Sequence, residues 1–127
     1  MRLLLDTQVY LWYLEDSTKL PAAAKDRIAA AAEVYVSSAS IWEASIKIGI
    51  GKLQADPEEL VLGIEGSGFT ELPISAAHAA RVATLPRHHN DPFDRLLLAQ
   101  AIEGPLALIS SDAMLTEYTE LVDLIKA

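Results

Sequence analysis

Short apolar runs alternate along the chain with longer segments whose hydrophobic residues recur every three to four positions. Runs of about four apolar residues between turn-forming residues are typical of buried strands, whereas the longer spacing predicts helices that face a core. We expect strands at residues 2–5, 34–37, 69–72, 106–109 and 122–125. We expect helices over residues 7–14, 21–32, 40–50, 57–67, 75–85 and 92–103, and a short helix after residue 112.

The regular alternation of strands and helices predicts an α/β fold. We expect a three-layer α/β/α sandwich around a central, mainly parallel sheet of four to five strands. A chain of 127 residues has the size of one domain, so residues 1–127 are expected to form a single unit. The strand order 3-2-1-4-5 would place the first and fourth strands side by side.

The composition narrows the possible functions. The chain has no cysteine, which excludes disulfides, thiolate zinc sites and cysteine nucleophiles. No apolar stretch approaches the roughly 20 residues that cross a bilayer, and Asp6 interrupts the first apolar run too early for a signal peptide. We therefore expect a cytoplasmic protein that does not enter a membrane. The net charge of −8, taken alone, argues against nucleic-acid binding and favours a bound cation or a basic partner.

Acidic residues fall at the ends of predicted strands and at the start of a predicted helix. Asp6 follows three consecutive leucines, and Asp112 follows the fourth strand. Asp91 and Asp94 flank the beginning of a strongly apolar helix, and Glu43 lies inside another helix that is otherwise mostly apolar. Each acid also has a purely structural explanation, since aspartate is a favoured N-cap and a glutamate can pair with a lysine one helical turn away.

The joint pattern of these acids favours a cation site. In open parallel sheets, ligands bind beyond the carboxyl ends of the strands, where the strand order reverses. The order 3-2-1-4-5 would bring Asp6 and Asp112 to one crevice, with Glu43 and Asp94 close to it. Four carboxylates this close raise one another's pKa values unless a counter-charge is present. A hard divalent cation with oxygen ligands, Mg²⁺ or Mn²⁺, supplies that charge.

Four short motifs occur along the chain in a fixed order. They are Leu-Leu-Leu-Asp6-Thr7, Ser38-x-x-x-Trp42-Glu43, Asp91-Pro92-Phe93-Asp94-Arg95 continuing to Ala99-Gln100-Ala101, and Ser110-Ser111-Asp112. Each motif is unspecific by itself, but the ordered set resembles the PIN-domain family. It is especially similar to the VapC-type ribonuclease toxins of type II toxin–antitoxin systems, over nearly the whole chain.

The resemblance implies a role for each acidic residue. The catalytic and metal-binding acids of the family correspond to Asp6, Glu43, Asp94 and Asp112. Asp91 is an accessory metal-site residue. Four further residues are expected to contact substrate: Thr7, Ser110, Arg87 and Arg95. For Arg95, pairing with a neighbouring acid is an equal alternative.

The resemblance also implies an activity and partners. We expect a Mg²⁺- or Mn²⁺-dependent endoribonuclease that hydrolyses RNA phosphodiester bonds, in tRNA or rRNA, by metal-activated water and so inhibits translation. A cognate antitoxin and a homodimer are implied as well.

Other residues near these motifs are expected to have structural roles. The adjacent His88 and His89 are expected to be solvated loop residues, and Trp42, Ile46 and Ile50 are expected to belong to the core, with any exposed remainder forming a dimer face or an antitoxin groove.

Other functions are compatible with a chain of this size. A receiver domain needs a pair of acids after the first strand and a phosphoacceptor aspartate after the third, but residues 69–74 contain only Glu71. A dehalogenase-type phosphatase needs Asp-x-Asp after the first strand, and the second position is Gln8. Two alternatives stay open at this point: a non-catalytic acidic module whose acids only cap helices, and a housekeeping PIN nuclease without an antitoxin.

Overall fold

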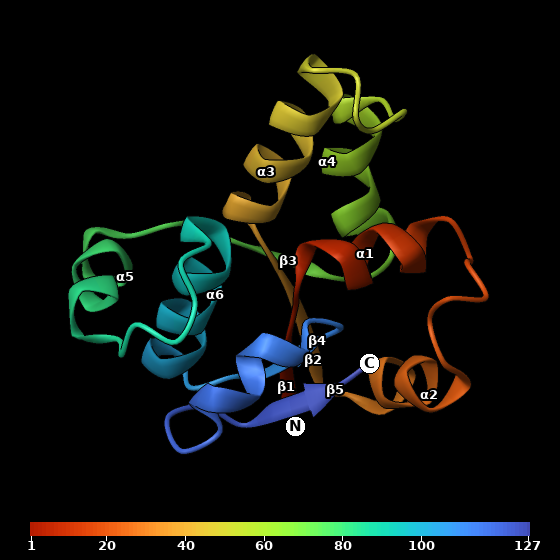
Figure 1. The fold of residues 1–127 in the computed structure, drawn as a ribbon. Helices are drawn as coiled ribbons and strands as arrows, with labels where there is room; N and C mark the ends of the chain where they lie inside the picture. Colours follow the sequence, from red (N-terminus) through yellow and green to blue (C-terminus); the bar gives the residue numbers. More distant parts are fainter.

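The computed structural model describes residues 1–127 and contains one five-stranded sheet (Figure 1). All neighbouring strands are parallel, and their order is β3-β2-β1-β4-β5. The strands are β1 (Arg2–Leu5), β2 (Glu33–Ser37), β3 (Thr70–Leu72), β4 (Ala107–Ser110) and β5 (Leu124–Lys126). The predicted α/β sandwich and its strand order 3-2-1-4-5 are therefore confirmed.

Six α-helices and two 3₁₀ helices connect and follow the strands. They are α1 (Thr7–Leu14), α2 (Ala22–Ala30), α3 (Ser38–Gly49), α4 (Pro57–Gly66), α5 (Ala76–Arg81), η1 (Val82–Thr84), α6 (Pro92–Glu103) and η2 (Ala113–Tyr118). The helix predicted for residues 75–85 is shorter than expected, because its last turn tightens into η1. Leu85 is extended, as expected for a residue that precedes proline.

The fifth strand starts two residues later than predicted. Val122 is buried, but its N–H donates to the carbonyl oxygen of Tyr118 in the turn after η2 rather than to a neighbouring strand. An apolar residue that packs in a turn has the same sequence signature as the first residue of a buried strand, so the hydrophobic pattern placed the strand boundary too early.

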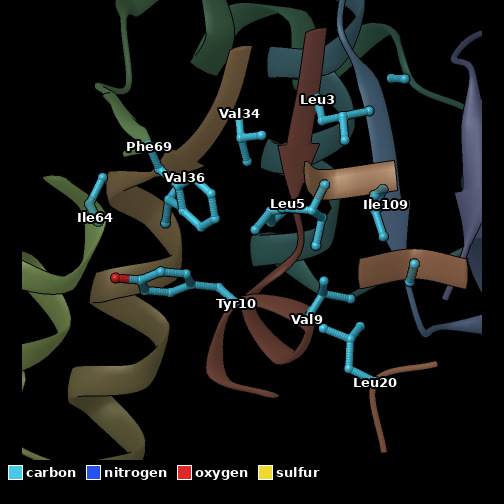
Figure 2. Close-up of a cluster of buried hydrophobic side chains, with 13 residues drawn as sticks. Leu3, Leu5, Val9, Tyr10, Leu20, Val34, Val36, Ile64, Phe69 and Ile109 are labelled. Atoms are coloured by element: carbon cyan, nitrogen blue, oxygen red, sulfur yellow. The ribbon is translucent and has the colours of Figure 1, made fainter. Parts of the chain in front are cut away.

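The sheet is covered on both faces, as the unbroken run of leucines in β1 indicates. Leu3, Leu4 and Leu5 are all fully buried. Leu3 and Leu5 belong to a cluster with residues of α1, α2 and α4 (Figure 2), whereas Leu4 belongs to a second cluster with Leu97 and Leu98 of α6. Alternate residues of a strand point to opposite faces, so three adjacent leucines supply both layers of the core.

The register of the strands sets the edge at which functional residues emerge. Leu5 lies opposite Val36 of β2 and Ile109 of β4, so these three strands end at the same level. The chain then continues directly into α1 after β1 and into α3 after β2, and α3 and α4 stand beyond this edge (Figure 1).

One apolar face of α3 is exposed, although its residues were expected to lie in the core. Trp42, Ile46 and Ile50 were predicted to be core residues, but they are 56%, 41% and 61% exposed. Because α3 stands beyond the sheet, its neighbours cover only part of its surface. Trp42 still packs its ring edge-on against Phe93 at the start of α6, with 4.9 Å between the ring centroids. None of the helices combines the length and apolar character needed to cross a membrane.

Tyr10 joins α1 to α4 inside the first core cluster. Its side chain is 1% exposed, and its hydroxyl donates a 2.6 Å hydrogen bond to the carbonyl oxygen of Leu60. Replacing Tyr10 with Phe removes this buried hydrogen bond. We expect Tyr10→Phe to lower the free energy of unfolding by about 1–2 kcal/mol, measured by urea denaturation. Tyr13→Phe is the matched control, because Tyr13 packs on Phe69 and its hydroxyl has no hydrogen-bond partner in the protein; equal losses in the two variants would contradict this account.

Candidate functional site

The four predicted carboxylates lie around one small pocket at the carboxyl edge of the sheet. The pocket has a volume of about 210 Å³, and only one of its lining residues, Leu11, is hydrophobic. Asp6 reaches it from the end of β1, Glu43 from α3, Asp94 from the first turn of α6, and Asp112 from the segment after β4. The fold therefore brings together four acids from chain segments that are far apart in sequence. The full lining is Asp6, Thr7, Gln8, Leu11, Glu43, Lys47, Asp94, Ser111 and Asp112.

Asp6 is the most deeply buried of these acids, at 4% exposure. It caps α1, because its Oδ1 accepts a 2.7 Å hydrogen bond from the backbone N–H of Val9. Its Oδ2 accepts hydrogen bonds from the Ser110 hydroxyl at 2.6 Å and from the Ser111 backbone N–H at 3.1 Å. Burial raises the pKa of Asp6, and these three hydrogen bonds act against that shift. The capping role and the place in the pocket thus belong to the same carboxylate.

Two hydroxyls that were predicted to contact substrate hold the acids in place. Ser110 is 2% exposed; its Oγ donates to Asp6 and accepts a 3.0 Å hydrogen bond from the backbone N–H of Asp112. The Thr7 hydroxyl is also buried, and it donates to Oε1 of Glu43 at 2.7 Å. Both hydroxyls are therefore already engaged with residues of the site.

Glu43 forms the salt bridge with Lys47 that its spacing predicted, but at the pocket and not on an open surface. The Lys47 ammonium lies 3.1 Å from Oε2 of Glu43, and the Glu43 side chain is only 14% exposed. Lys47 is the only lysine or arginine among the residues that line the pocket. One ammonium thus faces four carboxylates.

Asp94 is the second acid of the pocket whose pKa is raised. Burial raises the pKa of Asp94 to about 7; the hydrogen bond with His89 lowers it, and the carboxylates of Asp91 and Asp6 raise it. Asp91 itself does not line the pocket. It caps α6, where its Oδ1 accepts hydrogen bonds from the backbone N–H groups of Phe93 and Asp94. The accessory metal residue expected at position 91 is thus placed as a helix cap.

His89 contradicts the expectation of a solvated loop residue. Its Nε2 lies 2.8 Å from Oδ2 of Asp94 and 3.3 Å from Oδ2 of Asp112, and its side chain is 12% exposed. The neighbouring His88 is exposed, and its ring packs edge-on against Tyr118. Two adjacent histidines point apart, as residues in a loop commonly do. The sequence carried only a weak signal for His89, namely its place five residues before Asp94.

Arg95 and Arg87 have different surroundings. Arg95 pairs with no acid; Nη1 donates to the carbonyl oxygens of Pro86 and His89, and Nη2 donates to those of Val82 and Leu85. The guanidinium thus fixes the loop that precedes α6, and we do not retain Arg95 as a substrate contact. Arg87 lies exposed on the same loop and forms no salt bridge.

The donor set fits a hard divalent cation. The groups at the pocket are mainly carboxylate oxygens, which suit Mg²⁺ or Mn²⁺. Burial raises the pKa of both Asp6 and Asp94, and neighbouring carboxylates raise each pKa further by a smaller amount. One ligand atom each from His89, Asp94 and Asp112 also lie within 4.8 Å of one another. His89, Asp94 and Asp112 are thus close enough to share one ion, and Asp6 and Glu43 line the same pocket.

A toxin–antitoxin complex from Klebsiella pneumoniae has the same fold, with a TM-score of 0.65 and 18% identity over 96% of this chain and 94% of that chain. VapBC2 from Rickettsia felis, bound to a promoter DNA fragment, aligns with a TM-score of 0.68 and 19% identity over 100% of this chain and 98% of that chain. DNA-bound VapBC from Salmonella typhimurium gives a TM-score of 0.70 and 17% identity over 99% and 98% of the two chains. VapBC-1 from Haemophilus influenzae gives a TM-score of 0.71 and 15% identity, also over 99% of this chain and 98% of that chain. At these identities the likeness shows a common fold.

A comparison with family models identifies the family. The chain has no significant match among curated protein sequences. The model described as "PIN domain" matches residues 3–121, which cover nearly the whole sheet and all four acids of the pocket. PIN domains are nucleases that use divalent metal ions. The extent of this match shows that the chain belongs to the PIN domain family.

Proposed function

We propose that this chain is a Mg²⁺- or Mn²⁺-dependent endoribonuclease, the toxin of a VapBC-like toxin–antitoxin system. It would hydrolyse phosphodiester bonds in tRNA or rRNA and so inhibit translation in the cytoplasm. The observation that carries the proposal is the convergence of Asp6, Glu43, Asp94 and Asp112 on one small polar pocket. Capping alone accounts for Asp6 and Asp112, but it does not require four acids to share a pocket.

The residues of the pocket fit hydrolysis without a covalent intermediate. When bound, a divalent ion lowers the pKa of a coordinated water and stabilises charge on the phosphoryl oxygens. The carboxylates would hold the ion, and the Ser110 and Thr7 hydroxyls keep Asp6 and Glu43 oriented toward it. Attack by water leaves 5′-phosphate and 3′-hydroxyl ends. Arg87, exposed on the loop next to His89, is the proposed contact to a substrate phosphate.

Removal of one charged oxygen from the pocket tests the activity. Asp6→Asn, Asp94→Asn and Asp112→Asn keep the shape of each side chain but weaken its hold on a cation. Loss of several kcal/mol of transition-state stabilisation corresponds to a fall in the cleavage rate of roughly a hundredfold or more. The measurement is single-turnover RNA cleavage with Mn²⁺, with the product ends mapped.

Asp26→Asn is the matched control for this series, because Asp26 is an exposed acid on α2 that lies outside the pocket. It is expected to cleave at the wild-type rate. Full activity of the pocket variants, activity that persists in EDTA, or products with a 2′,3′-cyclic phosphate would refute the proposed mechanism.

The pKa of Asp94 predicts how metal binding depends on pH. In the metal-free protein this pKa is raised to about 7, whereas an unfolded aspartate titrates near 4. The protonated carboxyl therefore stabilises the fold fully below about pH 4, and that contribution is lost as the pH rises through about 7. In EDTA, we expect the Tm of the wild type to fall over this range more than that of Asp94→Asn.

Added Mn²⁺ should reverse this trend in the wild type. The ion binds the ionised carboxylate, so the rise in Tm on adding Mn²⁺ should be larger at pH 8 than at pH 5.5. Differential scanning fluorimetry in Mn²⁺ and in EDTA measures both effects. Parallel pH profiles for the wild type and Asp94→Asn would show that Asp94 does not titrate as described.

A second hollow lies beside the pocket and supports the antitoxin proposal. It has a volume of about 360 Å³, with an apolar floor and an acidic rim, and Leu11 lines both hollows. The apolar residues are Leu11, Leu14, Ala55 and Leu60, and the acidic ones are Glu15, Asp56 and Glu59. A basic segment with apolar side chains would complement it and would reach the pocket. The solved VapBC complexes also contain an antitoxin partner.

Charge reversal at the acidic rim tests this docking. Glu15→Lys combined with Glu59→Lys should weaken binding of the cognate antitoxin by roughly tenfold or more at low salt through slower association. RNA cleavage by the free toxin should be unchanged. Surface plasmon resonance gives the rate constants, and Asp26→Lys controls for the change in net charge. An unaltered association rate in the double variant would place the antitoxin elsewhere.

The exposed apolar face of α3 is the proposed homodimer surface. Trp42, Ile46 and Ile50 lie on one helix, and apolar surface of this kind on a small protein commonly marks an interface.

A further inference from the structure

We propose that His89 is a positioning residue of the metal centre, whose imidazole holds the carboxylates of Asp94 and Asp112 in place for the ion. This inference rests on the proposed metal-dependent function. It assigns a role to a residue that lies outside the four acids and that sequence reasoning had treated as solvated.

The imidazole lies between the two carboxylates. Nε2 is 2.8 Å from Oδ2 of Asp94 and 3.3 Å from Oδ2 of Asp112. When both carboxylates are ionised they can only accept hydrogen bonds, so Nε2 carries the proton and donates it. Oδ1 of Asp94 accepts no hydrogen bond from the protein, whereas Oδ1 of Asp112 accepts one from the Met114 backbone N–H. The arrangement leaves an oxygen of Asp94 free for an ion.

The position of the imidazole is fixed by the backbone around it. The hydroxyl of Tyr118, which is 1% exposed, accepts hydrogen bonds from the backbone N–H groups of His88 and His89 and donates to the carbonyl oxygen of Pro86. Nη1 of Arg95 donates to the carbonyl oxygens of Pro86 and His89. Residues of η2 and α6 thus hold the loop from both sides. A loop that only linked η1 to α6 would not need such fixation.

The contact of His89 with Asp94 and Asp112 offsets the repulsion between the two carboxylates. Asp94 lies in the first turn of α6, whereas Asp112 follows β4. The two residues belong to different elements, so no single helix or strand fixes the distance between their carboxylates. Two carboxylates without a shared donor repel each other. The imidazole hydrogen-bonds to Oδ2 of Asp94 and lies 3.3 Å from Oδ2 of Asp112, so it holds a polar hydrogen between the two carboxylates before an ion binds. Loss of a residue that hydrogen-bonds to a metal ligand commonly lowers metal affinity or activity by roughly 10- to 100-fold.

Binding of Mn²⁺ to the full-length protein tests the role of His89 directly. We expect His89→Leu to weaken the Kd for Mn²⁺ by roughly 10- to 100-fold, measured by titration with Mn²⁺ alone. His89→Gln should restore most of the affinity, because its side-chain amide nitrogen can reach the position of Nε2. His89→Asn should not, since its amide is too short. His88→Leu is the matched control and should bind as the wild type does, because the His88 ring packs on Tyr118 outside the pocket.

Electron paramagnetic resonance of the bound Mn²⁺ separates positioning from direct coordination. A positioning residue gives no hyperfine coupling from a directly bound nitrogen. Such a coupling in the wild type, lost in His89→Gln, would overturn the proposal by making His89 a ligand.

Comparing the Mn²⁺ affinities of the variants separates the role of His89 from the existence of the metal centre. Unchanged Mn²⁺ affinity in His89→Leu, with weakened binding in Asp94→Asn, would overturn the role of His89 and leave the metal centre intact. Absence of Mn²⁺ binding in the wild type would overturn the metal centre and the role of His89 together. If His89→Leu does not fold, the role of His89 is tested by comparing His89→Gln with His89→Asn. Equal Mn²⁺ affinities in those two variants would refute the positioning role.

Discussion

The free-energy cost of burying several carboxylates beside one another is the constraint on which the rest of this site depends. Asp6 and Asp94 lie at the same pocket as Glu43 and Asp112, and burial raises the pKa of both Asp6 and Asp94. Ionising these groups together costs free energy unless cationic or hydrogen-bonding groups offset it. The fold tolerates the cluster because hydroxyl, ammonium and imidazole groups contact its carboxylates, namely those of Ser110, Thr7, Lys47 and His89. Lys47 is the only ammonium at the pocket, and a divalent cation would supply further counter-charge.

The parallel sheet explains how such a cluster can form at all. Strands β1 and β4 pair in register, so the residues after them emerge at one level, and the Ser110 hydroxyl then joins Asp6 to the backbone of Asp112. The first turns of α1 and η2 supply N–H groups to Asp6 and Asp112. The same aspartates that begin helices thereby become rigid parts of the pocket. Structural and functional explanations of these residues are complementary here, because capping fixes where the carboxylate points.

The layers and strand order could be predicted because the hydrophobic pattern encodes them directly: an unbroken apolar strand followed by an acid marks both burial and a sheet edge. Asp6 and Asp112 were found by this signal. His89 was not, because a histidine in a polar loop has no periodicity and its contacts depend on where Tyr118 and Arg95 hold the loop. The backbone role of Arg95 was missed for the same reason. The exposure of Trp42 was missed because amphipathic spacing shows that a helix has an apolar face but not whether the sheet reaches it.

Diffraction from crystals of this protein grown with Mn²⁺, with data collected at the manganese absorption edge, tests the central claim most directly. The account predicts an anomalous peak at the carboxyl edge of the sheet, coordinated by oxygens of Asp6, Asp94 and Asp112, with Glu43 in the same shell or one water away. A pocket with these four acids in place and no manganese, at concentrations that saturate known manganese enzymes, would contradict it.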